Sequence, residues 1–253
     1  MKLPFVVDGD GRGPKLVFAH GLMGTGAVQH LQLAPLVEAG WTVATFDQRG
    51  HGSAPPVTDP SGYDPGPMGA DLWEVADAAG FDRCWVGGGS MGAATSFHAV
   101  KQQPGRVEGH IVAIPALRDA PHPLAFVFDA LADSVRDGGI DGLIALLRKL
   151  AADMGRAEQD EIFLEQLRSH DEGSIECALR TVPRWILPDV PEAFTTFGFP
   201  VVVVGWDADP IHPLDTAKDI AAAAKAELLQ LDQDAIFGER DLFGRKLLEV
   251  IHA

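Results

Sequence analysis

The glycine-rich segment Val86-Gly-Gly-Gly-Ser90-Met-Gly92 restricts the fold of this chain more than any other part of its sequence. An apolar run precedes this segment and a helical pattern follows it, so Ser90 lies on a strand-to-helix turn. Such a sharp turn leaves no room for side chains two positions before and after the serine, and Gly88 and Gly92 stand there. A nucleotide-binding loop with an incidental serine is the alternative. It is disfavoured because no Gly-Lys-Thr sequence or ribose-binding acid follows at the required place.

Strand and helix patterns alternate on both sides of this turn. The sequence predicts strands over 15–19, 41–46, 83–86, 107–114, 200–204 and 227–231. It predicts helices over 27–39, 68–79, 91–103, 214–224 and 242–252. Alternation with short connections is typical of a mostly parallel sheet with helices on both faces. We therefore expect a doubly wound α/β fold.

The alternation is interrupted between residues 121 and 196, where only helical patterns occur. A stretch of roughly 70 residues is too long for a loop inside a compact domain. We predict a helical insertion at 121–196 in a core domain made of 1–120 and 197–253. Most of its large apolar residues should pack it onto the core, and the others should line a pocket. These residues are Leu124, Phe126, Val127, Phe128, Leu143, Leu146, Leu147, Phe163, Leu164 and Trp185.

The composition narrows the choice of partners and compartment. A net charge of −16 repels phosphate backbones and anionic lipids, so we expect no nucleic-acid or membrane partner but a small apolar or neutral substrate. Neither a secretory signal pattern nor a membrane-length apolar run occurs. Cys84 and Cys177 are expected to be buried free thiols, which favours the cytoplasm. No metal or cofactor is expected, and the choice between monomer and homodimer is open.

Two further motifs accompany the serine turn, and with them the sequence resembles the α/β-hydrolase fold superfamily over essentially its whole length. His20-Gly21-Leu22-Met23-Gly24 is similar to the oxyanion loop of that family, and residues 47–53 are similar to the loop after its next strand. The resemblance implies that Ser90 is a nucleophile and that the backbone N–H groups of Leu22 and Met91 form an oxyanion hole. It also implies that the insertion is a cap that sets substrate choice. His20, Arg49 and His51 are expected to brace loops.

The resemblance further implies an acid after the strand that begins near residue 200. The family places its acid there, four residues before a proline, and Asp209 with Pro213 fits that spacing. Asp207 is the competing candidate. In a non-catalytic alternative these acids cap the following helix, as Asp215 could also do.

The base is where the sequence departs from the family pattern. The family places a histidine in the loop after the last strand. That loop holds no histidine here, and the expected position falls on Gln233. His212 is the first candidate replacement, although the pattern fits an exposed turn histidine better. His122 depends on how the insertion folds, His98 should pack against the core, and Asp232 or Asp234 could share a proton with Asp209.

The leading functional hypothesis is a small-molecule hydrolase of carboxylic esters or lactones that uses Ser90, Asp209 and an atypical base. A serine hydroxyl without an adjacent base is a weak nucleophile, so two other hypotheses stay open. The first is a catalytically degenerate member that binds a small molecule without turnover. The second is a lyase or cyclase that uses the same pocket without a covalent adduct on Ser90.

Overall fold

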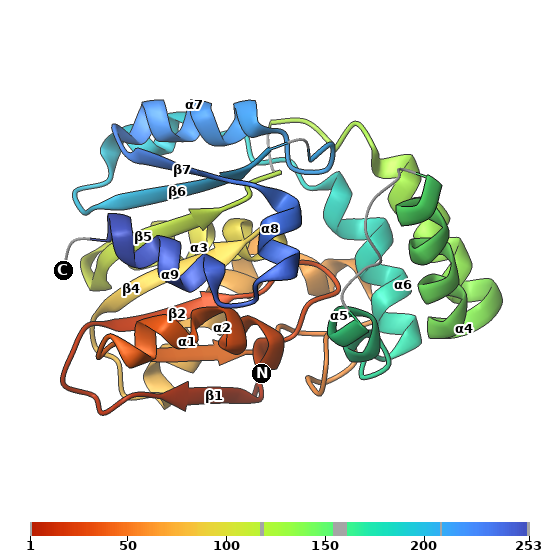
Figure 1. The fold of residues 1–253 in the computed structure, drawn as a ribbon, viewed down its shortest axis with the longest axis horizontal. Coiled ribbons are helices and arrows are strands. Elements are labelled where there is room, and N and C mark those ends of the chain that lie inside the picture. Colours follow the sequence, from red (N-terminus) through yellow and green to blue (C-terminus); the bar gives the residue numbers. More distant parts are fainter. Residues whose placement is uncertain (1, 117–118, 154–160, 208, 252–253) are drawn as a thin grey trace.

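The computed structural model describes residues 2–116, 119–153, 161–207 and 209–251, and these residues form a seven-stranded sheet with helices on both faces (Figure 1). The strand order is β1-β3-β2-β4-β5-β6-β7, in which β1 pairs antiparallel with β3 and all other pairs are parallel. The predicted mostly parallel α/β fold is therefore confirmed. The strands are β1 (Phe5–Asp8), β2 (Lys15–Ala19), β3 (Thr42–Phe46), β4 (Cys84–Gly89), β5 (Val107–Ala113), β6 (Val201–Trp206) and β7 (Glu227–Leu231).

The helices begin and end at local sequence signals. Thr25 caps α1, because its side chain accepts a hydrogen bond from the Val28 N–H, and Asp171 caps α6 in the same way through Ser174. Gly40 and Gly80 follow α1 and α2 with positive φ angles. The helices are α1 (Gly26–Glu38), α2 (Pro65–Ala78), α3 (Met91–Gln102), α4 (Ala125–Asp153), α5 (Glu161–Leu167), α6 (Glu172–Thr181), α7 (Leu214–Ala224), α8 (Gln233–Gly238) and α9 (Leu242–Val250).

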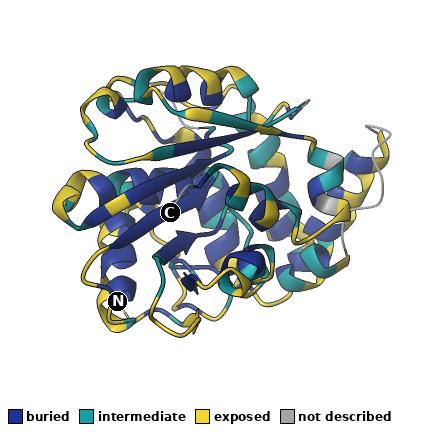
Figure 2. Ribbon diagram, turned by 60° about the vertical axis from the view of Figure 1, so that its left-hand side comes forward, coloured by how far each residue is buried: buried dark blue, intermediate teal, exposed yellow. Residues whose placement is uncertain are grey.

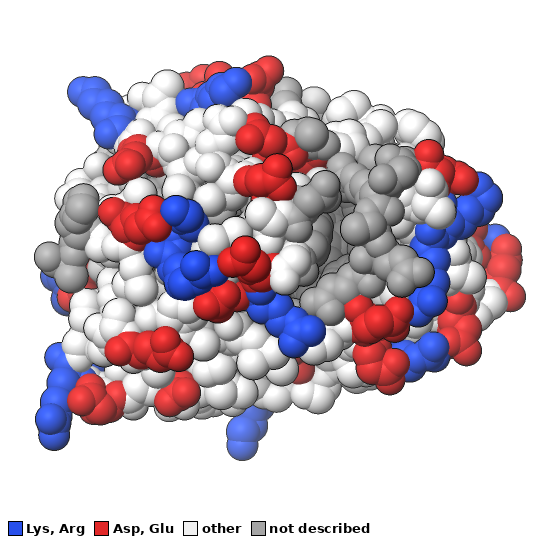
Figure 3. Space-filling model, in the orientation of Figure 1, with Lys and Arg blue, Asp and Glu red and all other residues white. Residues whose placement is uncertain are grey.

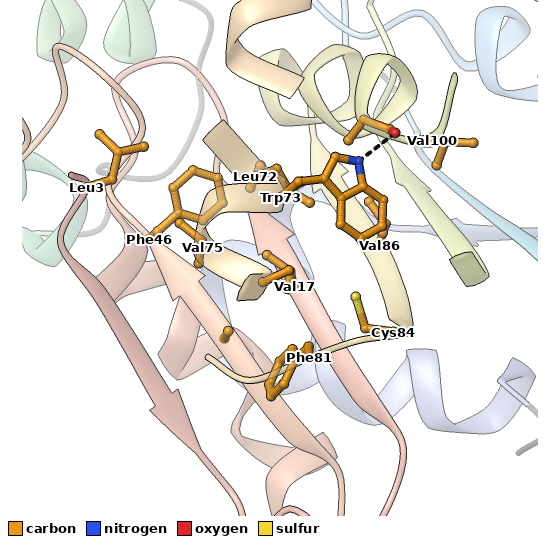
Figure 4. Packing of buried hydrophobic residues seen from close by; sticks show 14 of the residues in the cluster. Leu3, Val17, Phe46, Leu72, Trp73, Val75, Phe81, Cys84, Val86 and Val100 are labelled. Carbon is orange, nitrogen blue, oxygen red and sulfur yellow. Dashed lines mark hydrogen bonds between the residues drawn. The ribbon is translucent and has the colours of Figure 1, made fainter. Parts of the chain in front are cut away.

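Side chains of successive strand residues point to opposite faces of the sheet and build two separate layers of core. On β2, Leu16 and Phe18 pack with α1 and α9, whereas Val17 and Ala19 pack with α2 and α3. Figure 4 shows the second layer, in which the indole N–H of Trp73 donates to the Ala99 carbonyl at 2.7 Å. The inner strands are buried on both faces (Figure 2), which explains why their sequences are apolar runs.

The chain between β5 and β6 folds as helices, and its described residues contain no strand. The first of these helices, α4, is kinked at Gly139, which has a φ angle of 63°. Helices α4, α5 and α6 lie together at one end of the molecule (Figure 1). Phe126 is exposed, whereas Leu143, Leu147, Leu164 and Trp185 are buried. The limits 121–196 stay a prediction, and Phe194, near the end of that range, packs with α3 and α7 of the core.

The described residues also form short 3-10 helices, of which one precedes α2, one precedes β5 and two lie between α6 and β6. They are η1 (Pro60–Tyr63), η2 (Pro104–Arg106), η3 (Val182–Arg184) and η4 (Glu192–Thr196). Within the described ranges, no helix has both the length and the apolar character needed to cross a membrane.

Candidate active site

Ser90 lies on the turn between β4 and α3 in a backbone conformation that few residues adopt. Its φ angle is 54° and its ψ angle is −112°, and its N–H donates to the Ala113 carbonyl at 3.0 Å. A Cβ atom on Gly88 would lie 2.1 Å from the Gly92 carbonyl oxygen, and one on Gly92 would lie 2.0 Å from the Ala19 carbonyl oxygen. Both glycines are therefore sterically required, because they let β4, α3 and the end of β2 approach closely enough to hold the strained serine.

Three side chains form a continuous hydrogen-bonded chain that starts at this serine. The Ser90 Oγ lies 2.9 Å from the Nε2 of His212, and the Nδ1 of His212 lies 2.6 Å from the Oδ2 of Asp209. The ring therefore stands between the hydroxyl and the carboxylate, with one nitrogen facing each. The side chain of His212 is only 13% exposed. The expectation of an ordinary exposed turn histidine at position 212 is therefore wrong.

The carboxylate of Asp209 is buried and surrounded by donors. The Ile211 N–H donates to its Oδ1 at 2.8 Å, and the Gln233 amide donates to its Oδ2 at 3.2 Å. Burial alone would raise the pKa of Asp209, but the hydrogen bond and charge of His212 and the backbone N–H groups outweigh burial and lower it. Asp209 is thus held as the carboxylate. Gln233, which occupies the position where a histidine was expected, contacts the acid.

The loop after β2 passes beside the serine at Gly21. A Cβ on Gly21 would lie 3.4 Å from both the Gly89 carbonyl oxygen and the Ser90 Cβ. The Gly21 carbonyl accepts from the His20 ring Nδ1 at 2.7 Å and from the Gly24 N–H at 2.9 Å. Because a trans peptide is planar, these two bonds also fix the direction of the Leu22 N–H on the opposite side of the same peptide. The second predicted donor, Met91, is the first residue of α3, where the N–H groups have no partner within the helix.

A buried histidine cluster made of His20, His51 and His170 lies beneath this loop. The His20 and His51 rings are 5.2 Å apart and the His51 and His170 rings 5.5 Å apart between centroids. The Gln48 N–H donates to His20 Nε2 at 3.0 Å, so the ring proton of His20 is on Nδ1. Burial lowers the pKa of His20 to about 4, so this ring is neutral at pH 7. His20 and His51 are bracing residues, as expected.

His170 is a site residue that sequence reasoning missed. It lies between α5 and α6, accepts a hydrogen bond from the Gly52 N–H at 2.7 Å and contacts the Met23 carbonyl at 3.1 Å. Burial lowers its pKa. His170 therefore joins the insertion to the loops after β2 and β3. The sequence shows only that His170 lies in a polar stretch, Arg168-Ser-His170-Asp. Nothing in this stretch indicates which groups the ring contacts.

The other candidates lie elsewhere. His98 is half-buried beside α2, and Asp207 accepts a hydrogen bond from Gln230 at 2.6 Å. Asp232 caps α8 through the Ala235 N–H. The side chain of Asp234 lies outside the described residues. Asp215 stands in the first turn of α7, but the residue that precedes this helix, Pro213, makes no side-chain cap.

Arg49 and the two cysteines have structural surroundings. Arg49 forms two hydrogen bonds with the carboxylate of Asp71, at 2.6 and 2.8 Å, which confirms its expected bracing role. Both thiols are free, but only Cys84 is buried, so the expected burial of Cys177 is corrected to half-buried. Among the residues that the structure describes, no three histidine, cysteine or acidic side chains are placed to hold a metal ion.

His122 lies near the start of the predicted insertion and reaches the loop that carries Asp209 and His212. It is buried, and its Nε2 contacts the Ile211 carbonyl at 2.8 Å. Figure 3 shows the surface hollowed in the region where Figure 1 places α8 opposite α6. The face seen in Figure 3 mixes acidic and basic side chains around this hollow.

Comparison with known proteins agrees with this architecture. The sequence profile of the alpha/beta hydrolase fold family matches residues 14–235. A non-heme chloroperoxidase of Kitasatospora aureofaciens is 25% identical over 96% of this chain and 94% of its own length. A Variovorax paradoxus protein named for carbamate hydrolase activity is 34% identical, but over only 42% of this chain and 40% of its own length.

The solved structures lead to the same fold. The structure of an enol-lactonase from Burkholderia xenovorans has a TM-score of 0.77 with 20% identity, and the superposition covers 98% of this chain and 95% of that one. The profile match spans most of the chain and includes the strained serine turn and strands β2 to β7. This chain belongs to the alpha/beta hydrolase fold family.

Proposed function

We propose that the protein is a serine hydrolase that cleaves small carboxylic esters or lactones, with Ser90 as nucleophile, His212 as base and Asp209 as acid. One observation carries the proposal: the unbroken chain of hydrogen bonds from the Ser90 hydroxyl through His212 to Asp209. An adjacent base turns a weak hydroxyl nucleophile into an effective one. The base is atypical because it follows the acid by three residues instead of following the last strand.

The reaction follows from the positions of the atoms. His212 Nε2 accepts the Ser90 proton as Oγ attacks the substrate carbonyl carbon, and the carboxylate of Asp209 stabilises the imidazolium that forms. The Leu22 and Met91 N–H groups donate to the oxyanion of the tetrahedral intermediate, each contributing about 3 kcal/mol. His212 then returns the proton to the leaving alkoxide. Water attacks the acyl-enzyme in a second round that uses the same base.

The substrate class follows from charge and from the insertion. A protein with a net charge of −16 attracts anions poorly, which favours neutral or apolar esters and lactones. The helical insertion serves as a cap over the site, since His122 and His170 reach the loops that carry Ile211 and Met23. We propose no cofactor, no nucleic-acid or membrane partner, a cytoplasmic location, and a monomer or homodimer as the working form.

The test combines a covalent probe with turnover. The protein is incubated with a fluorophosphonate probe and, separately, with short-chain p-nitrophenyl esters and simple lactones. We expect Ser90 to be labelled, and we expect kcat to fall on the order of 10⁴-fold or more in both Ser90→Ala and His212→Ala. Thr95→Ser, on α3 but away from the reacting atoms, is the control for folding and should keep most of the activity.

Two results would contradict the proposal and would point to the alternatives. Tight binding of a small molecule with neither labelling nor turnover would indicate a binding protein. Turnover that survives Ser90→Ala would indicate chemistry without a serine adduct, as in a lyase or cyclase.

A further inference from the structure

Contacts with Leu124, Pro183 and Phe128 hold the ring and the backbone of His122 in place. Its Nδ1 accepts a hydrogen bond from the Leu124 N–H at 3.1 Å, its backbone N–H donates to the Pro183 carbonyl at 2.7 Å, and its ring packs edge-to-face against Phe128. The residue is 8% exposed. The segment that starts α4 and the turn at Pro183 therefore both fix the position of this ring.

The hydrogen bonds assign the proton on this ring. A nitrogen that accepts from a backbone N–H carries a lone pair, so Nδ1 is unprotonated and the proton of the neutral ring is on Nε2. Nε2–H then donates to the Ile211 carbonyl at 2.8 Å. This is a bond from the insertion to the loop that carries both the acid and the base.

Ile211 stands between Asp209 and His212, and both of its backbone polar groups are engaged. Its N–H donates to the acid at 2.8 Å, and its carbonyl accepts from His122. The same carbonyl carbon is bonded to the backbone nitrogen of His212. Because the peptide is planar, holding the Ile211 oxygen fixes the direction in which the His212 backbone, and with it the imidazole, leaves the turn.

The unusual placement of the base gives this contact its importance. Acid and base share the four-residue turn from Asp209 to His212, and the hydrogen bonds within the described part of this turn end on the carboxylate of Asp209. Gln233 supports the acid from α8. We propose that His122 is a positioning residue that holds His212 at hydrogen-bond distance from Ser90, so that the helical insertion sets the geometry of the base. This inference rests on the proposed function.

Two amide substitutions separate a positioning role from a local structural role. The amide nitrogen of glutamine reaches the place of Nε2, whereas the amide of asparagine reaches only the place of Nδ1. His122→Gln therefore keeps a donor for Ile211 and loses the acceptor for Leu124, and His122→Asn does the reverse. A misplacement of about 1 Å costs on the order of 10²-fold in rate, so His122→Asn should lower kcat by roughly 10- to 100-fold with KM little changed. His122→Gln should stay within about fivefold of the wild type.

The experiment measures kcat, KM and the melting temperature of both variants with p-nitrophenyl esters, with His98→Asn as the matched control. It also records the proton NMR signal of the His212 Nδ1–H, identified by its loss in His212→Gln. This signal reports the position of the base without turnover. It should be displaced or broadened in His122→Asn and kept in His122→Gln.

The outcomes distinguish a failure of the proposed function from a failure of the positioning role of His122. If the wild type fails to hydrolyse esters, the proposed function fails, and the NMR signal still decides whether His122 positions His212. An unchanged signal and unchanged kcat in His122→Asn, or losses in His122→Gln as large as those in His122→Asn, would overturn the positioning role. If His122→Asn does not fold, Phe128→Leu loosens the same ring. Its kcat should then fall several-fold, and an unchanged kcat and signal would likewise overturn the proposal.

Discussion

At the residue scale, the site is assembled from local and distant neighbours, and only the local ones leave a pattern in the sequence. Ser90 is marked by the glycines that its turn requires, and Asp209 by its spacing to Pro213. The contact between Ser90 and His212 joins residues 122 positions apart, and no spacing reports it. For the same reason the sequence could name His212 as a candidate but could not distinguish it from an exposed turn histidine.

Gln233 illustrates this limit and yields a prediction. The sequence pattern marks Gln233 as the place of a missing histidine, whereas its contact with Asp209 follows only from the fold. Gln233→Ala removes one donor from a buried carboxylate, and we expect kcat to fall roughly tenfold. Gln233→Glu places a second carboxylate about 3 Å from Asp209, where repulsion raises the pKa of one of the pair. At neutral pH this variant should be less active than Gln233→Ala.

The pH dependence tests this explanation. As the pH falls, Glu at position 233 takes up a proton, and its O–H can donate to Asp209 as the glutamine amide does. The activity of Gln233→Glu relative to the wild type, measured as kcat between about pH 8 and pH 5, should therefore rise towards acid pH. The same ratio for Gln233→Ala should stay nearly flat. A ratio for Gln233→Glu that is flat or falls towards acid pH would contradict the role of Gln233 as a donor to the acid.

At the element scale, the sequence predicts six of the strands but not β1, α8 or the 3-10 helices. The inner strands are apolar on both faces because helices cover both. β1 lies at the edge with every residue exposed, so burial leaves no pattern on it, and its antiparallel pairing with β3 decides its structure. α8 has six residues, fewer than two turns of helix, and the sequence predicts a loop there.

The turn between β4 and α3 gives a prediction at this scale, because its glycines are not equivalent. Gly92→Ala brings a Cβ to 2.0 Å from the carbonyl oxygen of Ala19, so the helix or the strand must move. We expect it to lower the free energy of unfolding by about 3 kcal/mol or more and to abolish ester turnover. Gly89→Ala meets nothing nearer than 3.9 Å and should change the free energy of unfolding by less than about 1 kcal/mol. Urea unfolding of the two variants measures the difference, and equal losses would show that close packing is not what the turn requires.

At the scale of the whole molecule, the helical insertion has a hydrophobic cluster of its own and shares a second cluster with the core. Ala178 and Trp185 of the insertion pack in one cluster with Met68 and Met91 of the core. Polar contacts add to this, because the Tyr63 hydroxyl donates to the Ser174 carbonyl at 2.9 Å and the Val57 N–H donates to the Ser174 hydroxyl at 2.9 Å. The lack of strand patterns predicts the insertion, but its attachment depends on residues 117 and 111 positions apart in sequence. It is therefore expected to unfold together with the core.

The buried histidines make the stability of this whole unit depend on pH. Burial lowers the pKa of His20 to about 4 and that of His110 to about 3, and it lowers the pKa of His51 and His170 as well. A histidine that is neutral when folded and has a pKa near 6.5 when unfolded binds more protons in the unfolded state. Its stabilising contribution is complete above about pH 6.5 and is lost as the pH falls towards the folded pKa.

We therefore expect the free energy of unfolding to fall between about pH 6.5 and pH 5, by on the order of 1 kcal/mol per pH unit for each such histidine. This window lies above the ordinary titration of carboxylates, so the slope reports the histidines. His110→Phe removes one titrating ring that stacks on Phe194, and it should reduce the slope, whereas Ser96→Ala removes only the hydroxyl beside His110 Nε2 and should keep it. Urea unfolding at pH 7, 6 and 5 measures the slopes. Equal slopes in the wild type and His110→Phe would show that proton uptake by this buried ring does not drive the loss, and the destabilisation would then have to come from the other groups.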